Sequence, residues 1–401
     1  MSPAGLSKTR LKRMHRILSG HVERKEMPGL VALVSRGEDV HVEALGTLTF
    51  NNPAPMSRDT IFRIASLAKP VTAVAAMILV EECKLRLDDV IDPWLPELAN
   101  RRVLKSITAG LDETVPACRS ITVRDLLTFR MGFGSVMALP GSTPIQKAIR
   151  EQKIGGDGPP RPAQAPATDE WLRRLGALPL MAQPGERWMY QVASDVLGVL
   201  IARASGQSFG AFLRDRLFGP LGMRDTAFHV PSEKRDRLAT SYMFNRQSDK
   251  LDVYDGVANS DWGPQPQFES GGGGLTGTPD DYFAFCRMLL NKGRHGREQI
   301  LSPATVELMT SDQLTPDERA GAELFFGQHS SWGFGMAVDI ARAEIFHSPG
   351  RFGWTGGLGT TAYTDPANGM IGILFTQRMM DSPKLPKVFT DFWTLAYGAI
   401  E

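Results

Sequence analysis

The chain is short of cysteine and of long apolar runs. Among its 401 residues there are only three cysteines, and Cys83, Cys118 and Cys286 are scattered along the chain. An odd, scattered set of this kind predicts no disulfide framework. The longest apolar stretch, residues 71–80, is about half as long as a membrane-spanning helix. The basic N-terminal stretch also lacks the apolar core of a secretory signal. These absences predict a cytoplasmic protein with no membrane span.

Strong charge and the usual cofactor motifs are also missing. The net charge of +1 offers no reason to expect a nucleic-acid partner. The seven histidines form no H-E-x-x-H or H-x-H pair, and no C-x-x-C occurs, so no metal site is predicted. The glycine run Gly271–Gly274 has no following Lys-Ser/Thr, and no dinucleotide fingerprint is present, so we expect no cofactor. A Ser-His-Asp triad stays possible because its members can lie far apart in sequence.

Strand patterns gather at the two ends of the chain, and helical patterns fill the middle. At 42% hydrophobic and 22% charged residues, the composition is that of an ordinary globular protein. We therefore expect an α+β fold in which residues 1–84 and 231–401 form a mixed domain around a mostly helical domain, residues 85–230. The predicted strands are Leu30–Ser35, Val40–Leu45, Phe334–Ile340, Ala343–Phe346, Thr360–Thr364 and Gly369–Gln377. The predicted terminal helices are Leu6–Lys25 and Lys387–Ala399, and Thr278 is expected to cap a helix over Pro279–Asn291.

Ser66 and Lys69 form the one S-x-x-K in the chain, at the start of an apolar segment. If Ser66 opens a helix, the Cβ atoms of the two residues lie about 5–6 Å apart on one face. A serine hydroxyl becomes a good nucleophile when a neighbouring group accepts its proton, and a lysine at this spacing can do so. The motif alone is equally typical of an N-cap serine followed by a solvated lysine.

A second serine motif competes with the first. Gly206-Gln207-Ser208-Phe209-Gly210 matches G-x-S-x-G, the nucleophile elbow that requires a sharp turn from a strand into a helix. Here helical stretches lie on both sides of the motif. We therefore predict that Ser208 is an N-cap between two helices and not a nucleophile.

Two further segments are candidates for the same site. Tyr190 precedes a helix, a position from which its ring can reach a cleft, although most tyrosines only pack. The glycines of residues 352–360 allow the backbone to approach a ligand closely, although a tight turn explains them equally well. Residues 155–167 are rich in Pro and Gly and predict a loop.

Several of these segments, in their order along the chain, resemble a known family. The chain is similar to the serine β-lactamase and penicillin-binding-protein superfamily, and within it to the class C-like esterases called family VIII carboxylesterases. The resemblance covers nearly the whole chain and implies a β-lactamase-like fold, with an antiparallel sheet flanked by helices and an active site in the cleft beside a helical domain. The matching segments are residues 60–69, 121–128, 184–198, 220–223, 273–276 and 354–356.

The resemblance also implies roles for individual residues. Ser66 corresponds to the nucleophile, Lys69 to its activating lysine, and Tyr190 to the tyrosine of the Y-x-N motif, which shares acid and base duty. The implied oxyanion hole is the pair of backbone N–H groups of Ser66 and Gly357. The implied substrate-binding positions are Val192, Trp354, Thr355 and Gly356.

Two departures from the family pattern bear on the substrate. Val192 replaces the asparagine of Y-x-N, and Trp354 replaces the lysine of K-T-G. Neither can bind a carboxylate as an asparagine–lysine pair would. The third motif is W-x-G in the esterase branch. The resemblance thus implies a serine carboxylesterase that cleaves short-chain acyl esters, small-molecule substrates, through a Ser66 acyl-enzyme.

Several alternatives remain open at this level. An acyltransferase would use the same acyl-enzyme, a β-lactamase or amide hydrolase would cleave amides, and a binding relative would have lost the chemistry. Either a neutral Lys69 is the base, or a charged Lys69 lowers the pKa of Tyr190. The sequence makes no prediction of the oligomeric state.

Overall fold

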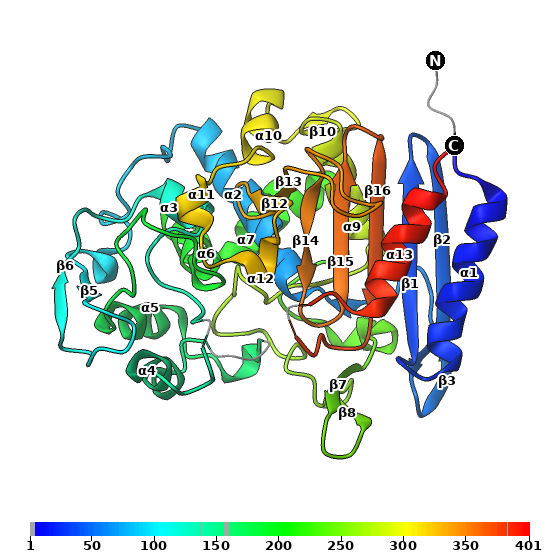
Figure 1. Ribbon diagram of the computed structural model, residues 1–401, viewed down its shortest axis with the longest axis horizontal. Helices are drawn as coiled ribbons and strands as arrows, with labels where there is room; N and C mark the ends of the chain where they lie inside the picture. Colours follow the sequence, from blue (N-terminus) through cyan, green and yellow to red (C-terminus); the bar gives the residue numbers. More distant parts are fainter. Residues whose placement is uncertain (1–4, 137, 156–159, 383) are drawn as a thin grey trace.

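The two ends of the chain meet in one eight-stranded antiparallel sheet, in a computed structural model that describes residues 5–136, 138–155, 160–382 and 384–401. The strand order is β12-β13-β14-β15-β16-β1-β2-β3. Strand β1 pairs with β16, so that Val31 lies opposite Phe375 and Leu33 opposite Ile373. Figure 1 shows the blue N-terminal strands beside the orange C-terminal ones. The α+β fold class and the antiparallel sheet are confirmed.

The bounds of the elements follow. The strands are β1 (Gly29–Arg36), β2 (Asp39–Thr49), β3 (Asn52–Pro55), β4 (Phe62–Arg63), β5 (Arg102–Leu104), β6 (Thr114–Pro116), β7 (Ser241–Asn245), β8 (Lys250–Asp255), β9 (Thr276–Gly277), β10 (Arg294–His295), β11 (Glu298–Gln299), β12 (Ser330–Trp332), β13 (Ala337–Asp339), β14 (Phe352–Gly356), β15 (Thr360–Asp365) and β16 (Met370–Thr376). The helices are α1 (Lys8–Glu23), α2 (Ala68–Glu81), α3 (Val123–Leu127), α4 (Pro144–Gln152), α5 (Thr168–Ala177), α6 (Val192–Ser205), α7 (Phe209–Leu213), α8 (Gly219–Leu221), α9 (Pro279–Leu290), α10 (Pro303–Met309), α11 (Pro316–Arg319), α12 (Glu323–Phe326) and α13 (Lys387–Gly398).

Side chains that alternate along the central strands give the sheet two apolar faces. Ala32 and Val34 pack with residues of α1 and α13 on one face. Val31 and Leu33 lie on the other face, in the cluster that contains α2 and α9. A period of two residues along a strand produces this division. In Figure 1, α13 and α1 lie in front of the sheet. The predicted cap of α9 is confirmed, because the Thr278 side chain accepts a hydrogen bond from the backbone N–H of Asp281.

The larger apolar cluster continues from the sheet into the helical part of the chain. It joins Phe375 of β16 to Val74 of α2, Leu126 of α3 and Leu197 of α6. In Figure 1, helices α3 to α6 lie to the left of the sheet, beyond β14. The division into residues 1–84 with 231–401 and residues 85–230 stays a prediction. In the part of the chain that the structure describes, no single helix is long and apolar enough to cross a membrane, and one pair bent by 80°, 192–205 with 209–221, meets that test by length and composition only.

Some predicted elements differ from the structure. The expected strand Ala343–Phe346 does not form, and of the expected strand Phe334–Ile340 only β13 is extended in the sheet. The ladder between β12 and β13 ends beside His329, whose carbonyl accepts from the backbone N–H groups of both Ile340 and Ala341. Of the predicted loop 155–167, residues 156–159 lie outside the described residues, and 162–164 form a 3₁₀ turn.

Candidate active site

Ser66 lies in a strained turn at the base of α2, not at the first position of an α-helix as predicted. Residues 65–67 form a 3₁₀ turn, and α2 begins at Ala68 without a side-chain cap. Ala65 has a φ of +46°, a left-handed conformation that non-glycine residues adopt at a cost. Strain of this kind is typical of a residue that presents a nucleophile to a cleft. The predicted one-turn separation of Ser66 and Lys69 still holds.

Several chain segments hold this turn in place. The buried guanidinium of Arg63 forms an ion pair with the buried carboxylate of Asp255 and also donates to the carbonyl of Ala239. The Thr360 hydroxyl donates to the carbonyl of Ile64 over 3.0 Å. A Cβ atom on Gly356 would lie 2.5 Å from that same Ile64 oxygen. The end of β14 can therefore approach the nucleophile turn only because residue 356 is glycine.

Lys69 is completely buried beside Ser66. Its Nζ atom lies 2.8 Å from the Ser66 Oγ atom, 2.9 Å from Oε1 of Gln191 and 2.5 Å from the carbonyl oxygen of Gly272. Burial lowers the pKa of Lys69 to about 7, and the nearby carboxyl of Asp195 opposes this change. A neutral amine has two N–H donors and one lone pair. In the neutral form of Lys69, two donors directed to the carbonyl oxygens of Gln191 and Gly272 leave the lone pair for the Ser66 hydroxyl.

Asp195 of α6 organises the loop that supplies one of these carbonyls. Its Oδ1 atom accepts hydrogen bonds from the Ser270 hydroxyl at 2.5 Å and from the backbone N–H of Gly272 at 2.9 Å. Burial raises the pKa of Asp195. The carboxyl thus fixes the peptide of Gly272, whose carbonyl accepts from Lys69.

Tyr190 reaches Ser66 from the other side. The Trp354 indole N–H donates to the Tyr190 hydroxyl over 2.8 Å. Burial raises the pKa of Tyr190 to about 12, whereas hydrogen bonds to Ser66 and Trp354 lower it. The tyrosine is therefore a phenol at neutral pH and can donate a proton. Its ring is held among aromatic neighbours, with ring centroids 4.9 Å from Phe325, 5.6 Å from Trp188 and 5.6 Å from Trp354.

Gly357 follows β14 and faces the same space as Ser66. A Cβ atom on Gly357 would meet nothing within 4 Å. Among the described residues, no protein acceptor takes a hydrogen bond from the backbone N–H of Ser66 or of Gly357. Both N–H groups are therefore available to a ligand, as the predicted oxyanion hole requires.

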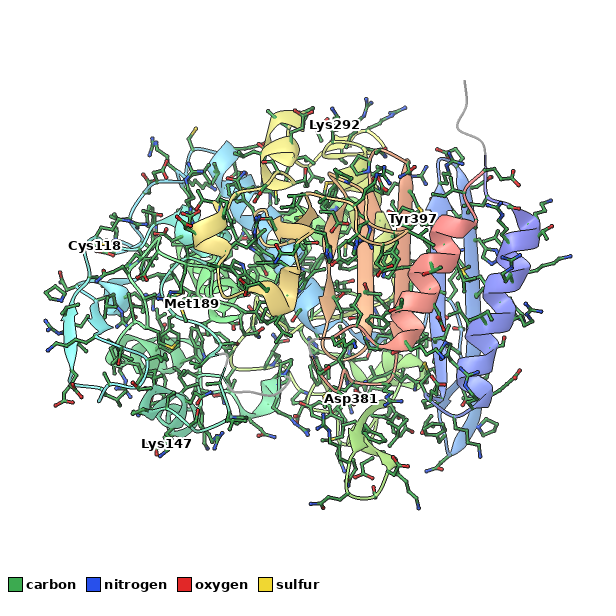
Figure 2. All side chains as sticks on the ribbon, viewed as in Figure 1. Cys118, Lys147, Met189, Lys292, Asp381 and Tyr397 are labelled. Carbon is green, nitrogen blue, oxygen red and sulfur yellow. The ribbon has the colours of Figure 1, made fainter. Side chains whose placement is uncertain are left out.

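Ser66, Tyr190, Trp354, Thr355 and Gly357 line one cavity of about 950 Å³. This volume is at the upper end of what a drug-sized ligand occupies. Other apolar and aromatic side chains complete its wall: Val136, Met243, Phe244, Leu324, Phe325, Phe346, Met379, Met380 and Leu385. Asp381, another lining residue, marks the lower end of the sheet in Figure 2, and Met189, next to Tyr190 in sequence, lies toward the helical part.

Two of the predicted substrate positions have other places in the structure. Gly356 packs against Ile64 and Ala65 and does not line the 950 Å³ cavity. Val192 is buried at the start of α6 and lines a neighbouring cavity of about 600 Å³, which shares Gln191 with the first. The tight approach of β14 and the inward turn of α6 are long-range features, so sequence spacing did not reveal them.

The alternative nucleophiles and bases fit less well. Ser208 is exposed and caps α7 by accepting from the backbone N–H of Ala211, as predicted. His329 and His347 line the large cavity, yet among the described residues neither forms a hydrogen bond with Ser66. The Nδ1 atom of His347 instead accepts from the backbone N–H of Glu344. The described geometry thus favours Lys69 and Tyr190 over a histidine triad.

The sequence did not predict the contacts of Lys69 with Gln191 and with the carbonyl of Gly272, or the nearby carboxyl of Asp195. Gln191 is adjacent to Tyr190 in sequence, so the segment was identified but not this side chain. A buried polar residue in an otherwise apolar helix was the one available signal for Asp195.

Comparisons with known proteins agree with this fold. A family model described as Beta-lactamase matches residues 14–388. Protein Rv1367c of Mycobacterium tuberculosis (strain ATCC 25618 / H37Rv) is 37% identical over 367 residues, 88% of this chain and 87% of that protein. Esterase EstB of Burkholderia gladioli is 30% identical over 385 residues, 91% of this chain and 89% of its own.

One solved structure, EstCE1, described as a hydrolase with promiscuous acyltransferase activity, has a TM-score of 0.79 and 24% sequence identity. The match covers 98% of this chain and 99% of that one, and it shows the common fold.

The chain therefore belongs to the beta-lactamase family and has the β-lactamase-like fold. By class it is a serine hydrolase. The predicted superfamily is confirmed, and EstB supports the esterase branch within it.

Proposed function

We propose that the protein hydrolyses neutral carboxylic esters through an acyl-enzyme on Ser66. The observation that carries this proposal is the position of Lys69, whose Nζ atom lies 2.8 Å from the Ser66 Oγ atom while two carbonyl oxygens accept from it. With a pKa of about 7, Lys69 is unprotonated in about half of the molecules at pH 7 and can then accept a proton. A base with a pKa near the working pH is the most effective kind.

In the first half of the reaction, Ser66 Oγ attacks the ester carbonyl carbon, and its proton passes to Lys69 Nζ. The carbonyl oxygen becomes an oxyanion between the N–H groups of Ser66 and Gly357, and loss of one such donor typically costs about 10²–10³ in rate. The alcohol oxygen leaves with the Tyr190 hydroxyl proton, and Tyr190 is reprotonated from Lys69. The two groups lie close together, because the Lys69 Nζ atom is 4.7 Å from the centroid of the Tyr190 ring.

In the second half, water attacks the acyl carbon and Lys69 Nζ accepts its proton, which then returns to the Ser66 Oγ atom. The acid leaves, and the Ser66 hydroxyl is restored. The proposed assignment makes Lys69 the base and Tyr190 the acid, because burial moves their pKa values to about 7 and about 12. Paired groups whose pKa values diverge in this way commonly divide the two roles.

The cavity supports an ester rather than a β-lactam substrate. Trp354 places an indole where a cation would bind the antibiotic carboxylate, and its N–H is already directed to Tyr190. The wall is rich in apolar side chains. The preference for short acyl chains stays a prediction, and the volume of about 950 Å³ leaves room for a larger alcohol part.

A second candidate, acyl transfer, differs only in the last step. An alcohol would replace water as the acceptor of the acyl group. The structural likeness to EstCE1, described as a hydrolase with promiscuous acyltransferase activity, favours testing it.

The test compares wild type, Ser66→Ala and Ser208→Ala on p-nitrophenyl acetate, p-nitrophenyl butyrate and a chromogenic cephalosporin. We expect Ser66→Ala to lose at least about 10⁴ in kcat, as nucleophile variants do, and Ser208→Ala to keep wild-type kcat. Mass spectrometry of the quenched wild type should find one acyl group on Ser66. Activity that survives Ser66→Ala, or cephalosporin turnover faster than ester turnover, would contradict the proposal. Added butanol tests the second candidate, since transfer yields butyl ester in place of acid.

A further inference from the structure

Gln191 has an unusual backbone conformation at the junction between Tyr190 and α6. Its φ is +92° and its ψ is −70°. L-residues with side chains rarely adopt this region, and such outliers gather at functional sites. A glycine would adopt this conformation without strain, so the presence of glutamine at position 191 indicates a role for its side chain.

The conformation brings the glutamine side chain to Lys69. The Gln191 Oε1 atom lies 2.9 Å from Lys69 Nζ, although the two residues are 122 positions apart in sequence. The Gly272 carbonyl oxygen accepts at 2.5 Å. These two acceptors and the Ser66 Oγ atom make three polar contacts with the amine. The Gln191 amide is thus one of the two oxygen acceptors, besides Ser66, that contact the amine.

The next residue cannot supply this contact. Val192 is buried, has no hydrogen-bonding atoms in its side chain and lines the neighbouring cavity. Gln191 itself lines both cavities and is partly exposed. Its amide is therefore placed between the buried lysine and the substrate space.

The other groups around the amine are few. Asp195 of α6 acts on Lys69 electrostatically and raises its pKa. The Tyr190 ring, from the segment before α6, has its centroid 4.7 Å from Nζ. The remaining contacts come from Ser66 and the carbonyl of Gly272. Gln191 is thus the one neutral side chain among these described contacts that can be changed without altering a charge or a proposed catalytic residue.

We propose that Gln191 is a positioning residue that holds Lys69 with its lone pair toward Ser66 and sets the pH at which the lysine becomes a base. The proposal rests on the function proposed above. It predicts that kcat/KM rises with pH as Lys69 loses its proton, and that the midpoint of this rise depends on residue 191.

The experiment measures kcat/KM for p-nitrophenyl butyrate between pH 5 and 10, read at the isosbestic wavelength of p-nitrophenol. Gln191→Glu has the same shape but places a negative charge beside the amine, so the midpoint should move to higher pH by about 1–3 units. Gln191→Met has a similar length without the carbonyl oxygen. Because the ammonium then loses an acceptor, the midpoint should move to lower pH, and kcat should fall about 10–100-fold as Lys69 is no longer held in place.

Gln191→Gly serves as the backbone control, since glycine adopts a positive φ without strain. It should melt at or above the wild-type temperature and still behave as Gln191→Met in the pH profile. Shifts in opposite directions for the Glu and Met variants support the proposal. Wild-type midpoints in both variants, or a wild-type profile in Gln191→Gly, would overturn it.

The same measurements separate the two proposals. If Ser66→Ala is inactive and the residue-191 variants keep the wild-type profile, the ester mechanism stands and Gln191 has no positioning role. If Ser66→Ala remains active, the proposed function fails whatever residue 191 does. Circular dichroism and thermal melting of each variant establish that all are folded.

Discussion

Lys69 should make the enzyme less stable than it would be without it, and the effect should depend on pH. Burial lowers the pKa of Lys69 from 10.5 to about 7. At 1.36 kcal/mol per pKa unit, this difference corresponds to about 5 kcal/mol of unfavourable free energy for the protonated form. Typical domains are stable by only about 5–15 kcal/mol, so the cost is a large share of the total.

Proton binding decides whether the free energy of unfolding rises or falls with pH. Between pH 7 and 10.5 the unfolded chain holds the Lys69 proton more tightly than the folded protein, so the free energy of unfolding rises with pH in this window. The cost is complete below about pH 7 and disappears above about pH 10.5. Lys69→Met contains no such group. Its stability relative to wild type should therefore be greatest near pH 7 and should shrink as the pH rises.

The free energy of unfolding of Lys69→Met should exceed that of wild type by less than about 5 kcal/mol. In Lys69→Met, the carbonyl oxygens of Gln191 and Gly272 lose their donor, and each unsatisfied group costs about 1–3 kcal/mol. This loss does not depend on pH. The pH dependence of the difference is therefore the quantity to measure, by urea denaturation of both proteins at pH 7, 8, 9 and 10.

An exposed lysine provides the matched control. Lys292 forms a surface ion pair with Glu307, and both side chains are 62% exposed. Lys292→Met should differ from wild type by the same small amount at every pH. If the difference between wild type and Lys69→Met were equally flat, Lys69 would keep its proton in the folded state up to pH 10. It could then not be the base that the mechanism assigns.

Four further variants test other parts of the site. Trp354→Phe keeps the aromatic wall but removes the N–H that donates to the Tyr190 hydroxyl; a lost hydrogen bond of about 1 kcal/mol predicts a roughly fivefold lower kcat in steady-state assays, and an unchanged kcat would contradict this role. Gly356→Ala places Cβ 2.5 Å from a carbonyl oxygen and should cost about 1–3 kcal/mol in chemical denaturation. Gly357→Ala places Cβ in open space and should change stability by less than about 0.5 kcal/mol, so equal losses in the two variants would refute the assigned geometry. Asp255→Ala leaves a buried guanidinium unpaired and should cost about 3–5 kcal/mol, whereas a loss below 1 kcal/mol would show that the ion pair does not hold the nucleophile turn.

Local patterns in the sequence were sufficient for most of the fold. The run Leu30–Ser35 alternates toward two apolar faces, and it became β1 at the centre of the sheet. The N-caps Thr278 and Ser208 were both confirmed, because a cap is set by hydrogen bonds within four residues. The strand expected at 343–346 does not form, because the ladder of β12 and β13 ends before it and these residues pair with no strand among the described residues, which composition alone does not indicate.

In the site too, some features follow from the local sequence and others from long-range contacts. The one-turn separation of Ser66 and Lys69 follows from their spacing in the sequence, and the structure shows the contact between their side chains. The family resemblance then indicated Tyr190 and the strand that contains Trp354. In the structure Tyr190 hydrogen-bonds with Ser66, and the Trp354 indole N–H donates to Tyr190.

Only the tertiary structure decided how the lysine is held. The contacts of Lys69 with Gln191 and Gly272 join residues far apart in sequence. The first of them depends on a backbone conformation at Gln191 that no residue type predicts. The full burial of Lys69 is also not predictable from residue types, and this burial is the physical cause of its pKa of about 7. A sequence can place a lysine one turn from a serine, but the protonation state of that lysine depends on everything that packs around it.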